Sequence, residues 1–345
     1  MWFYPTEVCI ATVVAENLSD GLAGFTGNMP MLLSSPLSVP HVPTIGIGHF
    51  PLVINSVDTA PFGAGLAPQG REQNIAMNEQ AVAMFEPVAK DIDRILETFE
   101  CKKQMPFRYP PDSMVALNDL YCQMSVPDLE PTRSDLPSNV RFFGTLTGGN
   151  DRRAYDKPDW FDDFILNDTS NRPLIMVTSG TLGGLSASDL ILPTIEACRS
   201  LPVRLVVCGV RVNQPDIELP ANARWAKWIP FEDLFPHTSI VVSSGGYGGI
   251  SQAFASGIPM ILAGTSEDKA ETNLRASWTG AAINLQTQTA SAEQVRNAVE
   301  KMLGEGSGFK EKAMAVKKEY EACDAVGSFV SAIDELAEKF YGTKA

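Results

Sequence analysis

The chain has 345 residues, which is too long for one ordinary hydrophobic core and favours two domains. Hydrophobic residues make up 44% of it and charged residues 20%, the balance of an ordinary globular protein. The net charge of −14 repels phosphate backbones and anionic lipids, so neither nucleic acid nor a membrane surface is expected as a partner. A nucleotide ligand is compatible with this charge, because backbone amides can bind a phosphate.

Cysteine and histidine usage argues against a metal site. The six cysteines form no CxxC pair, and the sequence has only three histidines. We therefore expect reduced thiols, no disulfide framework and no metal. The first residues lack a basic segment followed by a long apolar run, and no stretch approaches the ~20 apolar residues of a membrane helix. The expected location is the cytoplasm.

Residues 1–70 alternate short apolar runs with segments rich in proline and glycine. The runs at 7–14 and 44–48 predict buried strands. The stretch 58–69 (DTAPFGAGLAPQ) is dense in glycine and proline and predicts a long ordered loop.

A long helix is expected over residues 71–98. Its apolar positions recur at helical spacing and should face the interior as one stripe, formed by Phe85, Val88, Ile92, Ile95 and Leu96. Pro87 lies inside this segment and should kink or divide the helix.

The first domain should end near residue 147. Residues 126–144 carry several prolines and finish in the strand-like sequence VRFFG, and residues 148–158 are polar. We interpret the polar stretch as a domain boundary, so that the first domain covers residues 1–147 and the second begins at 148.

Beyond this boundary, predicted strands and helices alternate. The strands are expected at 174–178, 203–208, 223–227, 239–242, 260–263 and 282–285. The helices are expected at 186–199, 250–256, 273–279 and 291–303, followed by two more to the C-terminus. Repeated βα units predict an α/β domain with a parallel, doubly wound sheet.

Three loops in this domain follow a predicted strand, where a doubly wound sheet binds its ligands. The first is TSGT at 178–181, the second SSGGYGG at 243–249, and the third GTSEDK at 264–269. Glycines before a helix favour anion binding, and an acidic loop can accept hydrogen bonds from sugar hydroxyls. Each pattern alone also fits a structural role, as a tight turn, a close-packing turn or a capped helix start.

An aromatic segment lies between the first two loops. Trp228 precedes a rigid turn at Pro230, where its ring can stack on a base, although such a tryptophan is also often a core residue. His237 fits a structural role better than a catalytic one.

Taken together, these elements resemble the family 1 nucleotide-sugar glycosyltransferases, and among them the fungal and bacterial sterol-glucosyltransferase-like branch. The likeness is most specific over residues 220–285, from LPANARWAKWIPFEDLFPHTSIVVSSGGYGG through the EDK loop to GAAINL. It also reaches TAPFGAGLAPQ and DLPSNVRFFGTL. The resemblance implies a GT-B fold with two Rossmann-like, doubly wound domains. The second domain (148–325) would hold the donor, and the last helix (326–345) would return to the first domain, which is truncated.

The resemblance also implies which residues contact a UDP-sugar donor. Trp228 and Phe231 correspond to the segment that receives uracil, and Gly180 and Thr181 to a loop that touches the diphosphate. Asp268 and Lys269 correspond to an acidic–amide pair that holds the sugar hydroxyls. The loop at the diphosphate-binding helix corresponds to Ser244, Gly246, Tyr247, Gly248 and Gly249.

Some of these positions depart from the family pattern. Ser244 stands where a histidine is usual, Lys269 where a glutamine is usual, and Phe231 replaces a glutamine. The serine keeps one hydrogen-bond donor but brings no positive charge.

The resemblance does not supply a catalytic residue. The family's general base is a histidine in an N-terminal segment that should precede the residues matching EVCIATVVAEN, and the carboxylate that orients it should fall near Thr12. Neither His41 nor His49 matches the position of the base, so no catalytic residue is assigned.

The sequence leaves three hypotheses open. The chain is a glycosyltransferase that moves a hexose from UDP to a hydroxyl of a lipid or small molecule, alone or as one half of a split enzyme. Alternatively, it is an inactive descendant that binds sugar nucleotides or proteins, or a shortened gene product. A truncated first domain would expose a sheet edge or an apolar face, so we expect a homo-oligomer or a completing subunit.

Overall fold

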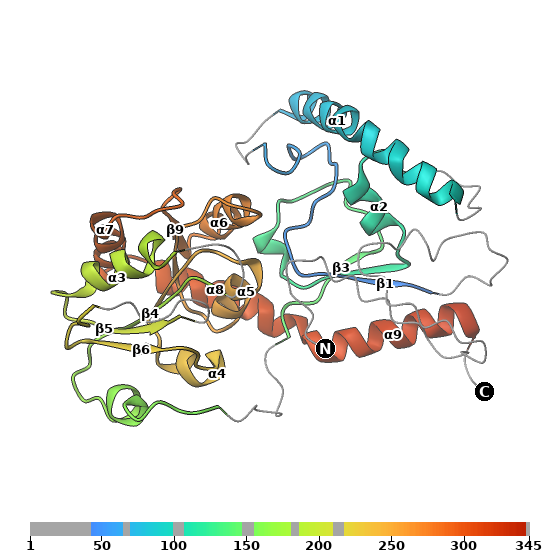
Figure 1. Ribbon diagram of the computed structural model, residues 1–345. Coiled ribbons are helices and arrows are strands. Elements are labelled where there is room, and N and C mark those ends of the chain that lie inside the picture. The colour runs from blue at the N-terminus through green and yellow to red at the C-terminus, as the bar shows by residue number, and fades with distance from the viewer. Residues whose placement is uncertain are drawn as a thin grey trace. The chain divides into compact units, whose positions relative to one another are not determined.

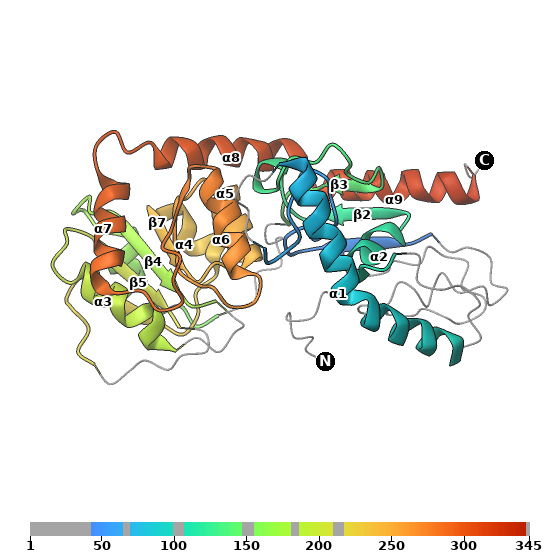
Figure 2. The ribbon, with the colours of Figure 1, turned by 90° about the horizontal axis from the view of Figure 1, so that it is seen from above.

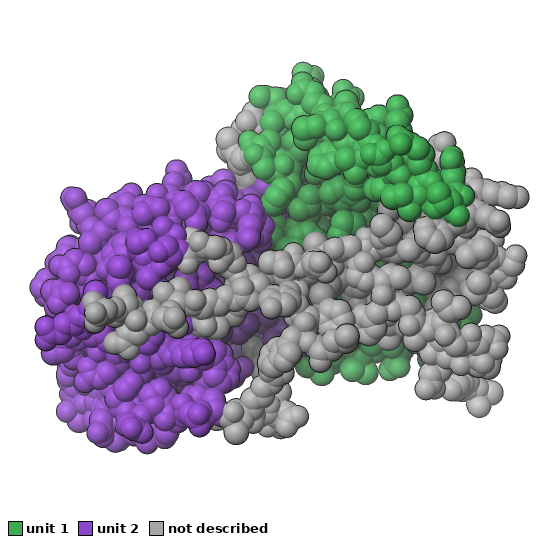
Figure 3. All heavy atoms as spheres, viewed as in Figure 1, with its two compact units in different colours: residues 1–144, 323–345 green, residues 145–322 purple. Residues whose placement is uncertain are grey.

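The computed structural model describes residues 43–64, 70–98, 107–146, 155–180, 186–209 and 217–342. The chain divides into two compact units (Figure 3). Unit 1 comprises residues 1–144 and 323–345, and unit 2 comprises residues 145–322. The sequence places these divisions slightly later, after residues 147 and 325. The strand expected at 7–14 lies outside the described residues.

Unit 2 is built on a six-stranded parallel sheet. Its strands are β4 Leu174–Thr178, β5 Arg204–Cys208, β6 Ala223–Ala226, β7 Ile240–Ser243, β8 Met260–Leu262 and β9 Ala282–Asn284. They lie in the order β6-β5-β4-β7-β8-β9 (Figure 1). From β4 the chain builds outward to β6, then returns to the other side of β4 and builds outward to β9. This is the doubly wound arrangement that the alternating elements predict.

Helices cover both faces of this sheet. They are α3 Ile191–Cys198, α4 Phe231–Leu234, α5 Tyr247–Ala255, α6 Lys269–Trp278, α7 Ala292–Leu303 and α8 Phe309–Cys323, with the short helices η3 Asp162–Leu166, η4 Ala187–Asp189 and η5 Phe235–His237. Figures 1 and 2 show α3 and α7 together on one face, and α5 and α6 on the other. The core of the first face joins Ile175 and Val177 of β4 to Ile195 and Val299 of the helices. Every residue of β4 and β5 is buried, as expected for the central strands of a covered parallel sheet.

Local sequence explains where several helices of unit 2 begin. Ser186 and Asp189 form the predicted capping box at η4, and Ser291 forms a second one with Gln294 at the start of α7. α6 begins at Lys269, earlier than the predicted Asn273, because the polar TSED segment turns directly into the helix.

Unit 1 contains a smaller parallel sheet, with strands β1 Ile45–Gly48, β2 Leu120–Gln123 and β3 Val140–Phe142 in the order β1-β2-β3. Its helices are α1 Arg71–Thr98, α2 Pro110–Ala116, η2 Pro127–Leu129 and α9 Ala325–Tyr341. One face packs on α9, where Ala332 and Leu336 meet Ile45 and Cys122. The C-terminal helix thus belongs to the first unit.

The structure bears on two expectations about α1. The helix continues through Pro87 without dividing, so of the two predicted outcomes, a kink or a division, the division is wrong. The predicted apolar stripe is not the inward face, because Val88 and Ile95 are exposed. The buried positions recur at helical spacing but are mostly small or polar, namely Asn74, Asn78, Ala81, Ala89 and Asp93. Hydrophobicity alone could not indicate this face.

Two sequence expectations concern thiols and membrane crossing. Among the described residues, Cys122, Cys198 and Cys208 are free and buried. Within the same residues, none of the helices combines the length and apolar character that a membrane crossing requires.

The capping box of α7 gives a test of the fold. The Ser291 hydroxyl accepts a hydrogen bond from the Gln294 amide at 3.1 Å, and the Gln294 side chain accepts one from the Ser291 amide at 2.9 Å. Ser291→Ala should cost about 1 kcal/mol and lower the Tm by about 2–4 °C in thermal unfolding. Ser291→Asp keeps an acceptor and should retain the Tm. Equal losses in the two variants would show that the cap contributes nothing.

Candidate functional site

The sheet of unit 2 reverses its winding between β4 and β7. These strands are paired in parallel register, with Thr178 opposite Ser243, so the loops that follow them leave the sheet side by side. In doubly wound sheets such a switch point is the usual ligand site.

Both loops turn in the same way as they leave the sheet. The Thr178 hydroxyl accepts a hydrogen bond from the Gly180 amide at 3.2 Å, and the Ser243 hydroxyl accepts one from the Gly245 amide at 3.2 Å. Each turn then requires a glycine, because φ is +82° at Gly180 and +94° at Gly245. The sequence patterns TSG and SSG therefore form two matched turns.

A pocket of about 250 Å³ opens beside the first loop. It brings together three of the predicted donor residues, Gly180, Trp228 and Phe231. The other lining residues are Thr178, Cys208, Ile229, Pro230, Glu232 and Gln252. Thr181, the fourth residue predicted near this loop, lies outside the described residues.

Aromatic contacts hold the two rings of the pocket. The Trp228 side chain is 42% exposed, and its ring meets Tyr155 edge-on, with centroids 5.5 Å apart and planes at 89°. Phe231 stacks on Phe235 at 4.4 Å. A partly exposed indole with a fixed edge can receive a planar base on its face.

The glycine loop begins α5 and leaves the start of that helix accessible. Among the described residues no side chain caps α5, and its first turn contains no acidic residue. A Cβ atom built on Gly246, Gly248 or Gly249 would meet none of the described neighbouring residues within 4 Å. The backbone amides of Gly246, Gly248 and Gly249 and the helix dipole can therefore act on an anion placed in the open space before these glycines.

Two residues that the sequence places in this loop are buried. Ser244 is 1% exposed, and its hydroxyl donates to the Ser179 carbonyl at 3.0 Å. Tyr247 is 3% exposed. Ser244 thus joins the two loops, and its only hydroxyl proton is committed to Ser179.

The third loop presents a carboxylate and encloses an ammonium group. Asp268 is half-buried, and burial raises the pKa of its carboxyl group. Lys269 is 4% exposed and forms an ion pair with Glu267. The Gln288 side chain accepts hydrogen bonds from the amides of Thr265 at 2.8 Å and Ser266 at 3.1 Å, which fixes the loop.

Sequence reasoning missed several residues that line the pocket. Gln252 lies one helical turn beyond Gly248, so the helix that follows the glycine loop carried a signal for it. Cys208 ends β5 in the pocket wall, and burial raises the pKa of its thiol to about 12, which keeps it neutral. Glu232 belongs to α4, where it had no distinguishing pattern.

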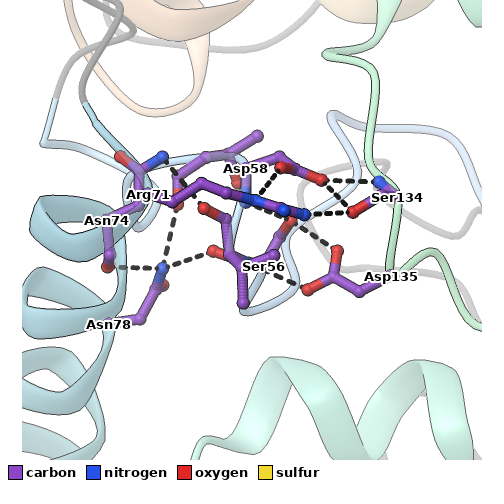
Figure 4. Close-up of polar contacts among 9 residues, drawn as sticks. Ser56, Asp58, Arg71, Asn74, Asn78, Ser134 and Asp135 are labelled. Carbon is purple, nitrogen blue, oxygen red and sulfur yellow. Dashed lines mark hydrogen bonds and ion pairs between the residues drawn. The ribbon is translucent and has the colours of Figure 1, made fainter.

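Unit 1 carries a separate polar cluster at the loop that follows β1 (Figure 4). The Asp58 carboxylate accepts hydrogen bonds from the Ser134 amide and hydroxyl, both at 2.6 Å, and from Arg71 at 2.9 Å. The Asp135 carboxylate accepts hydrogen bonds from the Ser56 hydroxyl at 2.6 Å and the Val57 amide at 2.8 Å.

Further buried side chains hold the same loop. Asn78 donates to the carbonyls of Ser56 at 2.8 Å and Thr59 at 2.9 Å (Figure 4). Glu130 and Arg133, an ion pair with side chains at most 3% exposed, bind the backbone amide and carbonyl of Leu52, both at 3.0 Å. The loop at residues 52–59, at the carboxyl end of the first sheet, is therefore fixed by the protein itself.

Solved structures identify the fold of the chain. It superposes on the glycosyltransferase of kitacinnamycin with a TM-score of 0.64 at 18% identity, covering 85% of this chain and 70% of that one. CalG4, the calicheamicin glycosyltransferase, gives a TM-score of 0.61 at 14% identity, with 87% and 68% covered. The architecture is therefore that of the GT-B glycosyltransferases.

Sequence comparison identifies the family. Residues 203–334 match the model of the erythromycin biosynthesis protein CIII-like, C-terminal domain. UDP-glycosyltransferase 2 of Phaeomoniella chlamydospora is 44% identical over 326 residues, covering 91% of this chain and 70% of the relative. UDP-glucosyltransferase avaP of Aspergillus versicolor is 31% identical over 324 residues, with 90% and 70% covered. The chain belongs to the UDP-glycosyltransferase family.

The unit 1 cluster predicts a specific pH dependence. Hydrogen bonds from Ser134 and the neighbouring Arg71 hold the pKa of Asp58 below its ordinary value. Because the folded-state pKa is lowered, the carboxylate stabilises the fold above the ordinary value, and this stability is lost as pH falls through the folded-state value. Asp58→Asn should therefore lower the Tm at pH 7, and the gap to wild type should close as pH falls from the ordinary carboxyl value of about 4 through the lower folded-state value.

The measurement is thermal unfolding by circular dichroism across this pH range. Ser134→Ala removes the main partner of the carboxylate and should also flatten the pH profile. Parallel profiles for wild type and both variants would show that Asp58 is not linked to stability.

Proposed function

We propose that this chain binds a UDP-sugar in unit 2 and transfers the hexose to a hydroxyl group of a lipid, such as a sterol, or of a small molecule. The observation that carries the proposal is the aromatic pocket at Trp228 beside the uncapped, glycine-lined start of α5, at the switch point of the sheet. Membership of the UDP-glycosyltransferase family supports the identity of the donor.

Each part of the donor has a matching environment. The uracil ring occupies the pocket between Trp228 and Phe231, next to Gly180. The diphosphate faces the amides that begin α5, over Gly246, Gly248 and Gly249. The hexose hydroxyls bind the loop at 264–269, where Asp268 offers a carboxylate.

The proposed reaction uses the same groups. The acceptor hydroxyl releases its proton to solvent as its oxygen bonds to the anomeric carbon, the bond from that carbon to the diphosphate oxygen breaks, and UDP leaves. Negative charge grows on the diphosphate as this bond breaks, and the preorganised amides of α5 stabilise it. Such stabilisation acts without a metal ion.

The acceptor side is proposed from unit 1 and from the relatives. The loop at residues 52–59 is held rigid and follows a strand at its carboxyl end, which suits it to contact the acceptor. Among the relatives, 4'-demethylrebeccamycin synthase is 32% identical over 301 residues. Its name supports a small-molecule acceptor.

Two further properties belong to the proposal. The free thiols of Cys122, Cys198 and Cys208 suit a reducing compartment, and we place the protein in the cytoplasm. Met84, Val88 and Ile95 form an exposed apolar stripe on α1, with exposed fractions of 69%, 46% and 44%, and this supports association into a homo-oligomer or with a completing subunit.

Replacing Gly248 tests the diphosphate site. Among the described residues, none outside the helix's own backbone comes within 4 Å of a Cβ at this position, so Gly248→Leu should fold with an unchanged or raised Tm, because leucine favours helix more than glycine does. The side chain would fill the space assigned to the diphosphate. The affinity for UDP, measured by calorimetry, should fall about 100-fold or more as two or more charged hydrogen bonds are lost.

Gly245→Ala is the matched comparison. Its Cβ would lie 1.6 Å from the Asn273 side chain at a φ of +94°, so this variant should lose Tm. Full UDP affinity in a folded Gly248→Leu chain would remove the diphosphate from the start of α5.

Trp228 tests the base pocket. Trp228→Ala should weaken UDP binding by roughly 1–3 kcal/mol, the range found for aromatic–base stacking. Trp278 ends α6 outside the pocket with a similar exposure of 47%, so Trp278→Ala is the control and should leave UDP affinity unchanged. A lower Tm with full affinity in Trp228→Ala would assign the ring to the core instead.

A further inference from the structure

Two buried side chains connect all three loops of the proposed donor site. Ser244 joins the second loop to the first through the Ser179 carbonyl. Asn273, on the second turn of α6, joins the second loop to the third. Its amide nitrogen donates to the carbonyls of Ser244 at 3.2 Å and Gly264 at 3.0 Å.

The bonding pattern fixes how Asn273 is oriented. Both acceptors are carbonyl oxygens, so the amide nitrogen must face them, and the side-chain oxygen faces Gly245. Asn273 is 0% exposed, and its oxygen has no hydrogen-bond partner in the described part of the chain. Burying the side-chain oxygen without a partner costs free energy. The two hydrogen bonds that the amide nitrogen donates to the Ser244 and Gly264 carbonyls offset this cost.

The Asn273 side chain occupies the space that a side chain at position 245 would need. A Cβ on Gly245 would lie 1.6 Å from the Asn273 oxygen, so the loop backbone packs directly on the amide plane. The next residue, Gly246, is the N-cap of α5. Any shift of Asn273 is therefore transmitted to the amides at the start of that helix.

We infer that Asn273 is a positioning residue for the donor. It fixes the start of α5 relative to the 264–269 loop, so that the diphosphate and hexose contacts form together. The inference rests on the proposed donor site in unit 2. Without these hydrogen bonds, both glycine-containing loops gain conformational freedom that the donor must remove when it binds.

Asn222 provides a matched control in the same unit. Its amide nitrogen also donates to two carbonyls, Cys198 at 2.9 Å and Val203 at 3.0 Å, and its side-chain oxygen is likewise buried without a partner among the described residues. Asn222 directly precedes β6, so it lies at the amino end of the sheet, opposite the donor loops.

The experiment compares the calorimetric affinity for UDP and for UDP-glucose in wild type, Asn273→Ala and Asn222→Ala, at a temperature well below every Tm. Both variants should lose Tm. Asn273→Ala should weaken UDP binding about ten- to hundredfold and should also reduce the extra affinity that the glucose adds, whereas Asn222→Ala should bind both ligands as wild type does.

Asn273→Ser is the second variant, because it keeps one hydroxyl donor and should recover part of the affinity. It decides the question if Asn273→Ala does not fold. Wild-type affinity in folded Asn273→Ala or Asn273→Ser, or an equal loss in Asn222→Ala, overturns the inference. If the inference about Asn273 fails but Gly248→Leu abolishes UDP binding in the same series, the proposed donor site is still supported. A wild-type chain that binds no UDP overturns both.

Discussion

The parallel pairing of β4 with β7 is the interaction on which the proposed site depends. These strands are distant in sequence, and their register places Thr178 opposite Ser243. Hydroxyl side chains at both positions then start matching turns. The aromatic pocket and the glycine loop lie together only because the sheet reverses its winding between these two strands. Burial of the apolar strand residues therefore stabilises the site as well as the core.

Hydrogen bonds from polar side chains, some of them buried, hold the loops of both units. Glycine-rich loops carry high conformational entropy, which apolar contacts at the surface seldom offset. In unit 2 this stabilisation comes from Ser244, Asn273 and Gln288, and in unit 1 from the carboxylates of Asp58 and Asp135. A loop fixed before its ligand arrives loses less entropy on binding, so the same bonds that stabilise the fold also favour recognition.

The strands and helix starts of unit 2 could be predicted from the sequence because each depends on a short segment. Apolar runs such as LIMVT and the Ser-x-x-Gln cap of α7 contain their own signal. The inward face of α1 could not be predicted in this way. Asn74 and Asn78 lie on that face because they donate hydrogen bonds to carbonyls of a loop that only the fold brings near. For the same reason the sequence could not indicate that Ser244 is buried against the Ser179 carbonyl or that Lys269 is buried beside Glu267. Whether a polar residue faces a ligand or a carbonyl depends on partners that are distant in the chain.

The chain and its proposed ligand are both negatively charged. The distribution of acidic residues around the proposed site reduces the repulsion between them. A net charge of −14 would repel a diphosphate at long range, but such repulsion is screened beyond about 10 Å at moderate salt. The first turn of α5 carries no acidic residue, so its backbone amides and the helix dipole favour an anion where the diphosphate would lie. The carboxylates of Glu267 and Asp268 lie on the neighbouring loop, where Lys269 neutralises the first and burial raises the pKa of the second. Among the described residues of the proposed site, the carboxylates of Glu267 and Asp268 lie where they can accept hydrogen bonds from sugar hydroxyls, and Glu232 lies in the base pocket, whereas the first turn of α5, assigned to the diphosphate, has none.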